Sequence, residues 1–196
     1  MALIRSKERG DTVAFPILTT KRLKLVEITH QHVDSIYEIL ALEEVTRYYG
    51  TNRFTFHGEA SRLIDMFHKN FIERRGIRWG IIVKENQKFI GTVGLNGLQL
   101  KNKRAEIGYE IHPAYWRKGF TTEAIEKVLR FSFEKLELYR IGAVVYPENE
   151  PSLSLLNKLG FTKEGLLRGY INQNDQFHDT FILSLLKPEW EKSQGE

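Results

Sequence analysis

Apolar and polar residues follow two different periods along this chain, and the changes of period separate expected strands from expected helices. Alternation at every second residue predicts half-buried strands, whereas apolar residues at i, i+3, i+4 and i+7 predict helices with one buried face. The expected strands are 22–28, 79–83, 89–95, 105–111, 141–146, 161–170 and 177–185. The expected helices are 32–42, 57–74, 122–136 and 151–159, the last of which Gly160 ends.

The order of these elements predicts a mixed sheet. Short polar connections join the strands between residues 79 and 111, which suits antiparallel hairpins. The helix 122–136 then links two strands as a βαβ unit, which crosses right-handedly and makes those strands parallel. We therefore expect an α/β fold with a mostly antiparallel sheet, one parallel crossover and helices on both faces.

The chain has 196 residues and contains no internal repeat, linker or low-complexity tract, so a single domain is expected. We place that domain at 18–190, after an N-terminal extension at 1–17 and before a C-terminal tail at 191–196.

Composition then narrows the classes of function. The absence of cysteine excludes a disulfide framework, a thiolate metal site and a cysteine nucleophile. The six histidines show no metal-type pairing, so no metal is expected. No apolar run approaches the roughly 20 residues that cross a bilayer, and the charged N-terminus does not look like a signal peptide. We expect a cytoplasmic protein that contacts no membrane.

The net charge by itself says little about the binding partner. Lys and Arg number 29 against 25 Asp and Glu, a surplus of 29 − 25 = +4 that is spread over the chain. No aromatic stacking motif accompanies the basic residues, so direct binding of nucleic acid is not expected. An anionic small molecule explains the surplus equally well.

The segment between the strand 105–111 and the helix 122–136 is the first candidate site. A turn that opens a helix gathers unpaired backbone N–H groups at the positive end of the helix dipole, where an anion is favoured. Gly119 allows close approach of a ligand, and Arg117 and Lys118 add positive charge. The alternative interpretation is an ordinary helix start capped by Thr121 or Thr122.

A second turn begins at Asn149, after the next parallel strand, and the two turns are expected to flank one crevice. Together they resemble the GCN5-related N-acetyltransferase (GNAT) superfamily of acetyl-CoA-dependent enzymes. The superfamily's phosphate turn, Gln/Arg-x-x-Gly-x-Gly/Ala, is similar to residues 116–121, and its Asn-x-x-Ser is similar to Asn149 and Ser152. The Lys-Leu-Gly-Phe that follows at 158–161 also resembles the superfamily. Further segments resemble the branch of ribosomal-protein N-terminal acetyltransferases: 19–25, 105–109, 165–168 and 178–179.

This resemblance spans roughly residues 19–190 and implies that acetyl-CoA is the cosubstrate. The residues it implies for binding acetyl-CoA are Ile111, Trp116, Arg117, Lys118, Gly119, Phe120, Thr121, Thr122, Asn149 and Ser152. Trp116 and Thr121 depart from the superfamily's pattern, but the turn binds pyrophosphate mainly through backbone N–H groups. The pantetheine arm is expected between splayed strands that end near Ile111 and Tyr146.

The resemblance further implies direct attack of an amine on the thioester in a ternary complex, and the lack of a cysteine nucleophile agrees with this. Glu106 is the expected base, acting directly or through water; Glu110, on the same strand face, is the second choice. Both carboxylates could equally be solvated strand residues. The tyrosine that many members carry at the position of Leu156 is absent, so Ser152 is expected to assist the departing thiolate; a plain first-turn residue is the alternative.

The acceptor that the resemblance implies is a protein N-terminal α-amine, that of a ribosomal protein. The rival acceptor is a small amine such as an antibiotic, polyamine or amino acid, and the rival of another class is a non-catalytic acyl-CoA-binding module. The candidate walls of an acceptor pocket, which could also be core residues, are Tyr48, Tyr49, Tyr109 and Tyr170. A homodimer is left open as the oligomeric state.

Overall fold

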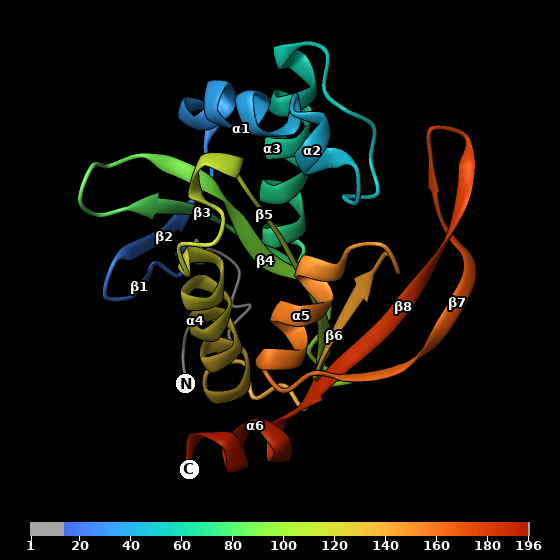
Figure 1. Cartoon of the computed structure of the whole chain (residues 1–196). Coiled ribbons are helices and arrows are strands. Elements are labelled where there is room, and N and C mark those ends of the chain that lie inside the picture. Colours follow the sequence, from blue (N-terminus) through green and yellow to red (C-terminus); the bar gives the residue numbers. More distant parts are fainter. Residues whose placement is uncertain (1–13, 196) are drawn as a thin grey trace.

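The computed structural model describes residues 14–195, and an eight-stranded sheet runs through them in the order β1-β2-β3-β4-β5-β6-β8-β7 (Figure 1). The strands are β1 (Leu18–Thr19), β2 (Leu23–Glu27), β3 (Ile77–Val83), β4 (Phe89–Gln99), β5 (Arg104–Ile111), β6 (Arg140–Val145), β7 (Thr162–Gln173) and β8 (Gln176–Leu186). The helices are α1 (Val33–Leu40), α2 (Glu43–Thr46), α3 (His57–Ile72), α4 (Phe120–Glu134), α5 (Glu150–Lys158) and α6 (Lys187–Gln194), with 3-10 turns η1 (His30–His32) and η2 (Pro113–Tyr115).

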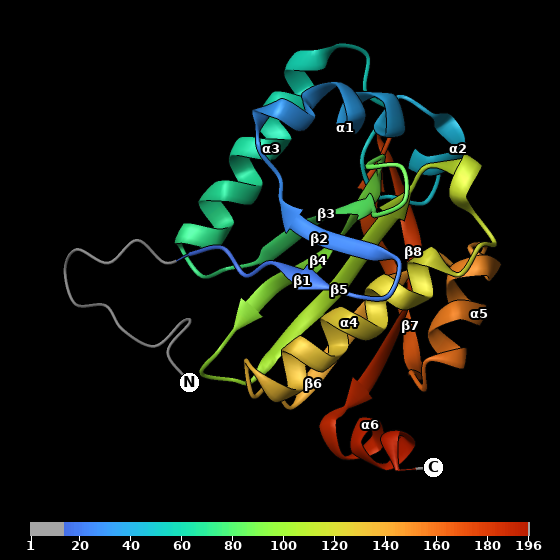
Figure 2. The ribbon, with the colours of Figure 1, turned by 90° about the vertical axis from the view of Figure 1, so that its left-hand side faces the viewer.

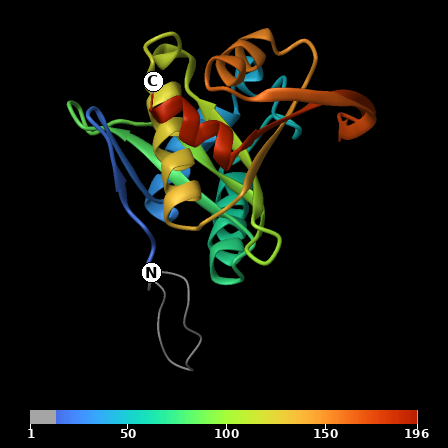
Figure 3. The same ribbon diagram turned by 90° about the horizontal axis from the view of Figure 1, so that it is seen from below.

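Helices cover both faces of this sheet. α4 and α5 lie on one face, and α1 and α3 lie on the other (Figures 1 and 2). Seen from below, the strands separate α3 from α4 (Figure 3). The stripe Ile125, Val128 and Leu129 of α4 is buried, as its spacing predicts, and each such side chain contributes about 1.5–3 kcal/mol. The predicted α/β fold class is thus confirmed.

The parallel pair β5–β6 is the feature that positions the site. Its register covers only Arg104 to Glu106 against Arg140 to Gly142, and beyond these residues the two strands diverge. β5 continues to Ile111 paired only with β4, while β6 continues paired only with β8. We call the opening between 107–111 of β5 and 143–145 of β6 the splay. Backbone groups of β5 that face β6 in this stretch therefore have no strand partner.

Three elements, β1, α2 and α6, are not among those that the periodicity predicts. They are short, and each has a single buried residue, so no periodic pattern can emerge. In α6 that residue is Trp190, which packs against Phe133 with ring centroids 5.2 Å apart. The helix continues past residue 190, where the C-terminal tail was expected to begin.

The expected N-terminal extension lies mostly outside the described residues, but its last part contacts the sheet. Phe15 packs against Phe71 and Trp79, and the indole Nε1 of Trp79 donates a hydrogen bond to the Pro16 carbonyl at 2.6 Å. Residues 14–17 are therefore part of the packed domain. Within 14–195, no helix is both long and apolar enough to cross a membrane.

Candidate functional site

A cavity of about 540 Å³ opens on the β5 side of the splay. Its lining comes from the end of β5, from α2 and the residues after it, from the turn before α4, and from the start of α5. The residues expected from the sequence that line it are Ile111, Trp116, Arg117, Gly119, Thr121, Thr122, Asn149 and Ser152, together with Tyr48, Tyr49, Tyr109 and Glu110. Lys118, Phe120, Glu106 and Tyr170 are outside this lining.

The turn before α4 has the geometry of an anion site. Arg117 and Gly119 adopt left-handed backbone conformations, with φ of 57° and 75°, and Gly119 is the N-cap of the helix. The first helical hydrogen bond runs from Glu123 N to Gly119 O at 3.2 Å. The amides of residues 120–122 precede that bond, so they are the free N–H groups at the positive end of a 15-residue helix.

Arg22, at the start of β2, holds this turn in place. Its guanidinium donates to the Lys118 carbonyl at 2.9 Å and to the Glu123 carboxylate at 2.6 Å, and Thr20 donates to the same carboxylate at 2.5 Å. Burial by itself would raise the pKa of Glu123, but these hydrogen bonds outweigh it and lower the pKa. The acid in the first turn of α4 is thus paired with Arg22, which limits its repulsion of an anion at the turn.

The side chains of Lys118 and Phe120 support the turn from outside the cavity. The Lys118 ammonium lies 5.4 Å from the centre of the Tyr115 ring, and the Arg22 guanidinium lies 4.4 Å from the centre of the Phe120 ring. Trp116, which stands where the superfamily has Gln or Arg, donates its indole N–H to the Ile111 carbonyl at 2.8 Å. This bond ties the turn to the last residue of β5.

Three polar side chains meet where α5 begins. Asn149 is the N-cap of α5, and its Oδ1 accepts a hydrogen bond from Ser152 N at 3.3 Å. The Ser152 hydroxyl lies 2.7 Å from the Tyr109 hydroxyl, which β5 supplies. Burial raises the pKa of Tyr109 to about 12, and its hydrogen bond with Ser152 opposes that rise. The phenol therefore keeps its proton at neutral pH.

Glu110 belongs to a buried network on the opposite face of β5. Its carboxylate pairs with the Arg78 guanidinium of β3 and accepts a hydrogen bond from the Thr92 hydroxyl of β4. Arg78 Nε also donates to Thr92 at 2.6 Å, and Arg78 Nη2 donates to the Tyr49 hydroxyl at 3.3 Å. Both partners of the ion pair are almost fully buried, so Glu110 is committed to a structural contact.

Glu106 sits at the point where β5 and β6 diverge. It is half-buried, opposite Asn96 of β4 and Gly142 of β6. On the neighbouring strand β6, Arg140 binds Glu164 of β7 through two hydrogen bonds, of 2.7 and 2.5 Å. The Arg140 guanidinium also feels the charge of Glu106, so the three groups share one electrostatic neighbourhood. Glu106 remains a candidate base.

The site therefore joins an anion-binding turn to a slot between two strands, with hydroxyl groups at the junction. An elongated thioester with a pyrophosphate at one end fits such a shape, because the free amides of α4 suit the phosphates and the open edge of β5 suits amide groups. No group of His, Cys, Asp and Glu that could hold a metal ion occurs among residues 14–195.

Sequence reasoning missed Arg22 as the residue that holds the turn and Tyr109 as the partner of Ser152. Arg22 and Glu123 are separated by 101 positions and Tyr109 and Ser152 by 43, so no local pattern signals either contact. Glu44 and Arg47 of the α2 region also line the cavity, and no motif indicated them.

Comparison with known proteins gives consistent matches. A model of the acetyltransferase (GNAT) domain matches residues 22–162. The uncharacterized N-acetyltransferase YoaA of Bacillus subtilis is 48% identical over 174 residues, which cover 89% of this chain and 98% of YoaA. The [ribosomal protein uS5]-alanine N-acetyltransferase of Escherichia coli is 28% identical over 129 residues, 65% of each chain.

Solved structures match the fold. The spermidine N-acetyltransferase from Vibrio cholerae, in complex with CoA and spermine, superposes with a TM-score of 0.77 at 22% identity. The match covers 88% of this chain and 99% of that one.

Proposed function

Because the chain belongs to the GNAT family of acetyltransferases, it is an acetyl-CoA-dependent N-acetyltransferase, and we propose that its acceptor is the α-amine of a protein N-terminus. The observation that supports this acceptor is the similarity to the ribosomal-protein alanine N-acetyltransferase of Escherichia coli. An α-amine also needs less help from a base than a lysine, since it titrates near 7.7–8.0 and not near 10.4.

Different residues of the cavity have different roles in the proposed reaction. The amides at the start of α4 hold the pyrophosphate, and the splay receives the arm that carries the thioester. When bound, acetyl-CoA supplies an activated acetyl group. The neutral amine attacks the carbonyl carbon as the bond to sulfur breaks, and Ser152 donates a hydrogen bond to the sulfur that leaves.

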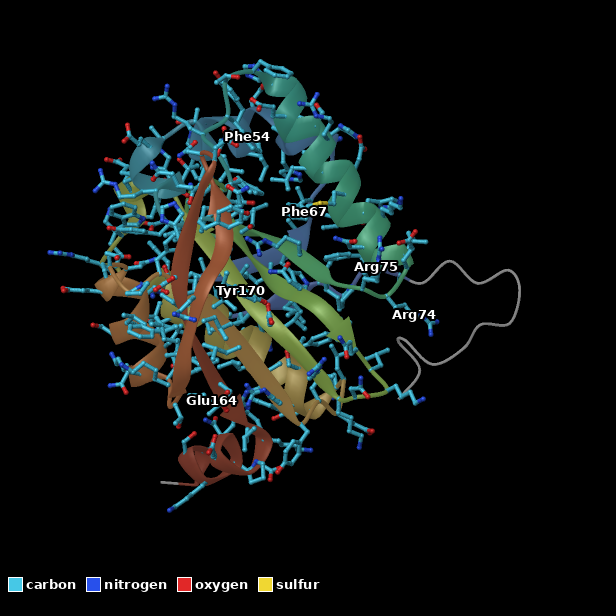
Figure 4. All side chains as sticks on the ribbon, turned by 90° about the vertical axis from the view of Figure 1, so that its right-hand side faces the viewer. Phe54, Phe67, Arg74, Arg75, Glu164 and Tyr170 are labelled. Atoms are coloured by element: carbon cyan, nitrogen blue, oxygen red, sulfur yellow. The ribbon has the colours of Figure 1, made fainter. Side chains whose placement is uncertain are left out.

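Glu106 is the base in this proposal. It is half-buried and has no ion pair among the described residues, whereas Glu110 is bound to Arg78 and Thr92. Because Glu106 lies outside the cavity lining, it takes the amine proton through water. Figure 4 looks onto the sheet from the side on which α3 carries Phe67 and β7 carries Tyr170 and Glu164. The acceptor approaches from this side.

A small amine is the second candidate acceptor, and a hydrogen-bonded bridge near α2 favours it. The amide of Gln173 donates to the carbonyls of Thr46 and Thr51 at 2.9 and 2.8 Å and accepts from the Tyr146 hydroxyl at 2.6 Å. This bridge ties the residues after α2 to the end of β7. It closes one route by which a polypeptide could reach the splay.

A panel of acceptors separates the two candidates. CoA release is measured with short peptides that begin with Ala or Ser, with the same peptides blocked at the N-terminus but carrying an internal Lys, and with spermidine, an aminoglycoside and free amino acids. We expect kcat/KM for the free N-termini to exceed that for every other acceptor at least tenfold. Mass spectrometry of the product should place the acetyl group on the first residue.

Two results would contradict the proposed acceptor. Faster turnover of spermidine or another small amine would favour the second candidate. Equal turnover of blocked and free peptides would indicate a lysine acceptor.

A further inference from the structure

The hydroxyl groups of Tyr109 and Ser152 form an isolated pair beside the splay. They lie 2.7 Å apart, one on β5 and the other in the first turn of α5, and both residues line the cavity. Within residues 14–195, no other side chain lies within hydrogen-bond distance of the Ser152 hydroxyl. One hydrogen of this pair is therefore left over for an atom that the protein does not supply.

The direction of the hydrogen bond between Tyr109 and Ser152 follows from the relative acidity of the two hydroxyl groups. A phenol is a stronger acid than an aliphatic alcohol, so Tyr109 is the better donor and the Ser152 oxygen accepts. Tyr109 stays protonated because burial raises its pKa to about 12, although the bond to Ser152 opposes the rise. Once the Ser152 oxygen accepts from Tyr109, its own hydrogen can point into the cavity.

The rest of the environment fixes both groups. Tyr109 packs against the main core, and the backbone of Ser152 is held by the Asn149 cap at 3.3 Å. Leu156, one turn further along α5, is fully buried and has no hydrogen-bonding group. The hydroxyl pair is consequently the source of O–H donors at this part of the cavity wall.

We infer that Tyr109 is a positioning residue that aims the Ser152 hydroxyl at the sulfur of CoA. This inference rests on the proposed function and deepens it. As the amine nitrogen bonds to the carbonyl carbon, the carbon–sulfur bond breaks and its electron pair stays on sulfur. Ser152 then donates a hydrogen bond to the thiolate, Tyr109 donates to Ser152, and the amine proton leaves separately through the base.

The inference predicts a preference for the thiolate that can be measured without any acceptor. Binding of CoA and of desulfo-CoA, which lacks the sulfur, is compared by calorimetry at pH 6.5 and pH 9, because the fraction of CoA present as thiolate rises with pH over this range; a cysteine thiol titrates near 8.5. A hydrogen bond to a charged acceptor contributes roughly a factor of 10 or more in affinity. We expect wild-type protein to prefer CoA by about that factor at pH 9 and much less at pH 6.5.

Substitution of either hydroxyl should reduce this preference. Tyr109→Phe and Ser152→Ala should each bring the CoA to desulfo-CoA ratio at pH 9 below about threefold, with the affinity for desulfo-CoA unchanged. The double variant should lose no more than Ser152→Ala, because both groups act through one hydrogen. With an active acceptor, kcat should fall in parallel while the KM for acetyl-CoA stays constant.

Ser132→Ala is the matched control for Ser152→Ala, since Ser132 is also a helix serine, is buried and donates a 2.7 Å hydrogen bond to the Val128 carbonyl, outside the cavity lining. The ratio of CoA to desulfo-CoA affinity in this control variant should equal that of wild type. An unchanged ratio in Tyr109→Phe would overturn the role of Tyr109, and an unchanged ratio in Ser152→Ala would overturn the contact with sulfur. Failure of every peptide acceptor would instead contradict the proposed function, because the binding ratio needs no acceptor.

Discussion

The turn before α4 shows how much depends on the backbone of single residues. Gly119 has a φ of 75°, which a residue with a side chain adopts only under strain, and a Cβ there would lie 3.3 Å from Arg22 Nη2. Arg22 also holds the Lys118 carbonyl and the Glu123 carboxylate. A change at Gly119 therefore disturbs both the anion site and the residue that supports it.

Gly119→Glu should abolish binding of acetyl-CoA, because it places a carboxylate beside the amides that receive the pyrophosphate and strains the turn. Calorimetry should show at least a hundredfold loss of affinity in a folded variant. Gly97→Glu is the control for strain alone, since Gly97 has a φ of 55° and nothing within 4 Å of its Cβ position. Unchanged affinity in Gly119→Glu would exclude the turn as the phosphate site.

The two carboxylates of β5 should respond differently to the same substitution. Glu106→Gln should lower kcat at least tenfold and change its pH profile, with acetyl-CoA affinity close to wild type. Glu110→Gln should instead destabilise the fold by about 3 kcal/mol in urea unfolding, since it leaves the buried Arg78 charge without its counterion. Full activity of Glu106→Gln at every pH would remove Glu106 as the base.

At the scale of elements, the geometry of the site comes from the short pairing of β5 with β6. The two strands share only three residue pairs, and β6 then follows β8 while β5 follows β4. The edge strand β7 is attached to the same part of the sheet through Glu164. This side chain bonds to Arg140 of β6 and to Ser184 of β8. These bonds hold β7 against β6 and β8.

The contact of Glu164 with Arg140 should make the free energy of unfolding depend on pH in the acidic range. The hydrogen bonds from Arg140, and then from Ser184, lower the pKa of Glu164 from 4.5 to about 2. Because the folded pKa is the lower one, the contribution to stability is complete above about 4.5 and disappears as the pH falls towards 2. The gap in unfolding free energy between wild type and Glu164→Gln should shrink over that range.

Urea unfolding at pH 7, 4 and 2.5 measures this gap. Glu85→Gln, in the exposed turn between β3 and β4, serves as the control and should show no such dependence. A gap between wild type and Glu164→Gln that is constant with pH would show that the pair does not anchor β7.

For the whole molecule, the cavity brings together segments that lie far apart in the sequence. Its lining runs from Glu44 to Leu155, and the turn within it is held by Thr20 and Arg22. A ligand that binds there contacts segments that are joined only in the folded state, so its binding energy adds to the stability of the whole domain.

Acetyl-CoA at about 100 times its dissociation constant should therefore raise Tm by roughly 5–10 °C for a chain of this size. A melting curve recorded with and without the ligand tests this, and Gly119→Glu should show no increase. A wild-type Tm that does not respond to acetyl-CoA would mean that the ligand does not select the folded cavity.

The sequence by itself determined the order of the main strands and helices, the parallel crossover and the two turns that line the cavity. Those features are local, because each depends on the spacing of apolar residues within one element or on a glycine within one turn. The sequence did not predict β1, α2 or the C-terminal helix α6, since a single buried residue in each leaves no periodic pattern.

Only the tertiary structure decided which polar groups are free to act. It bound Glu110 to Arg78 and gave Glu106 no ion pair within residues 14–195, it brought Tyr109 to Ser152, and it set Arg22 against the turn before α4. The physical reason is that hydrogen bonds and ion pairs between distant segments depend on strand register and helix placement, which the packing of the whole core determines.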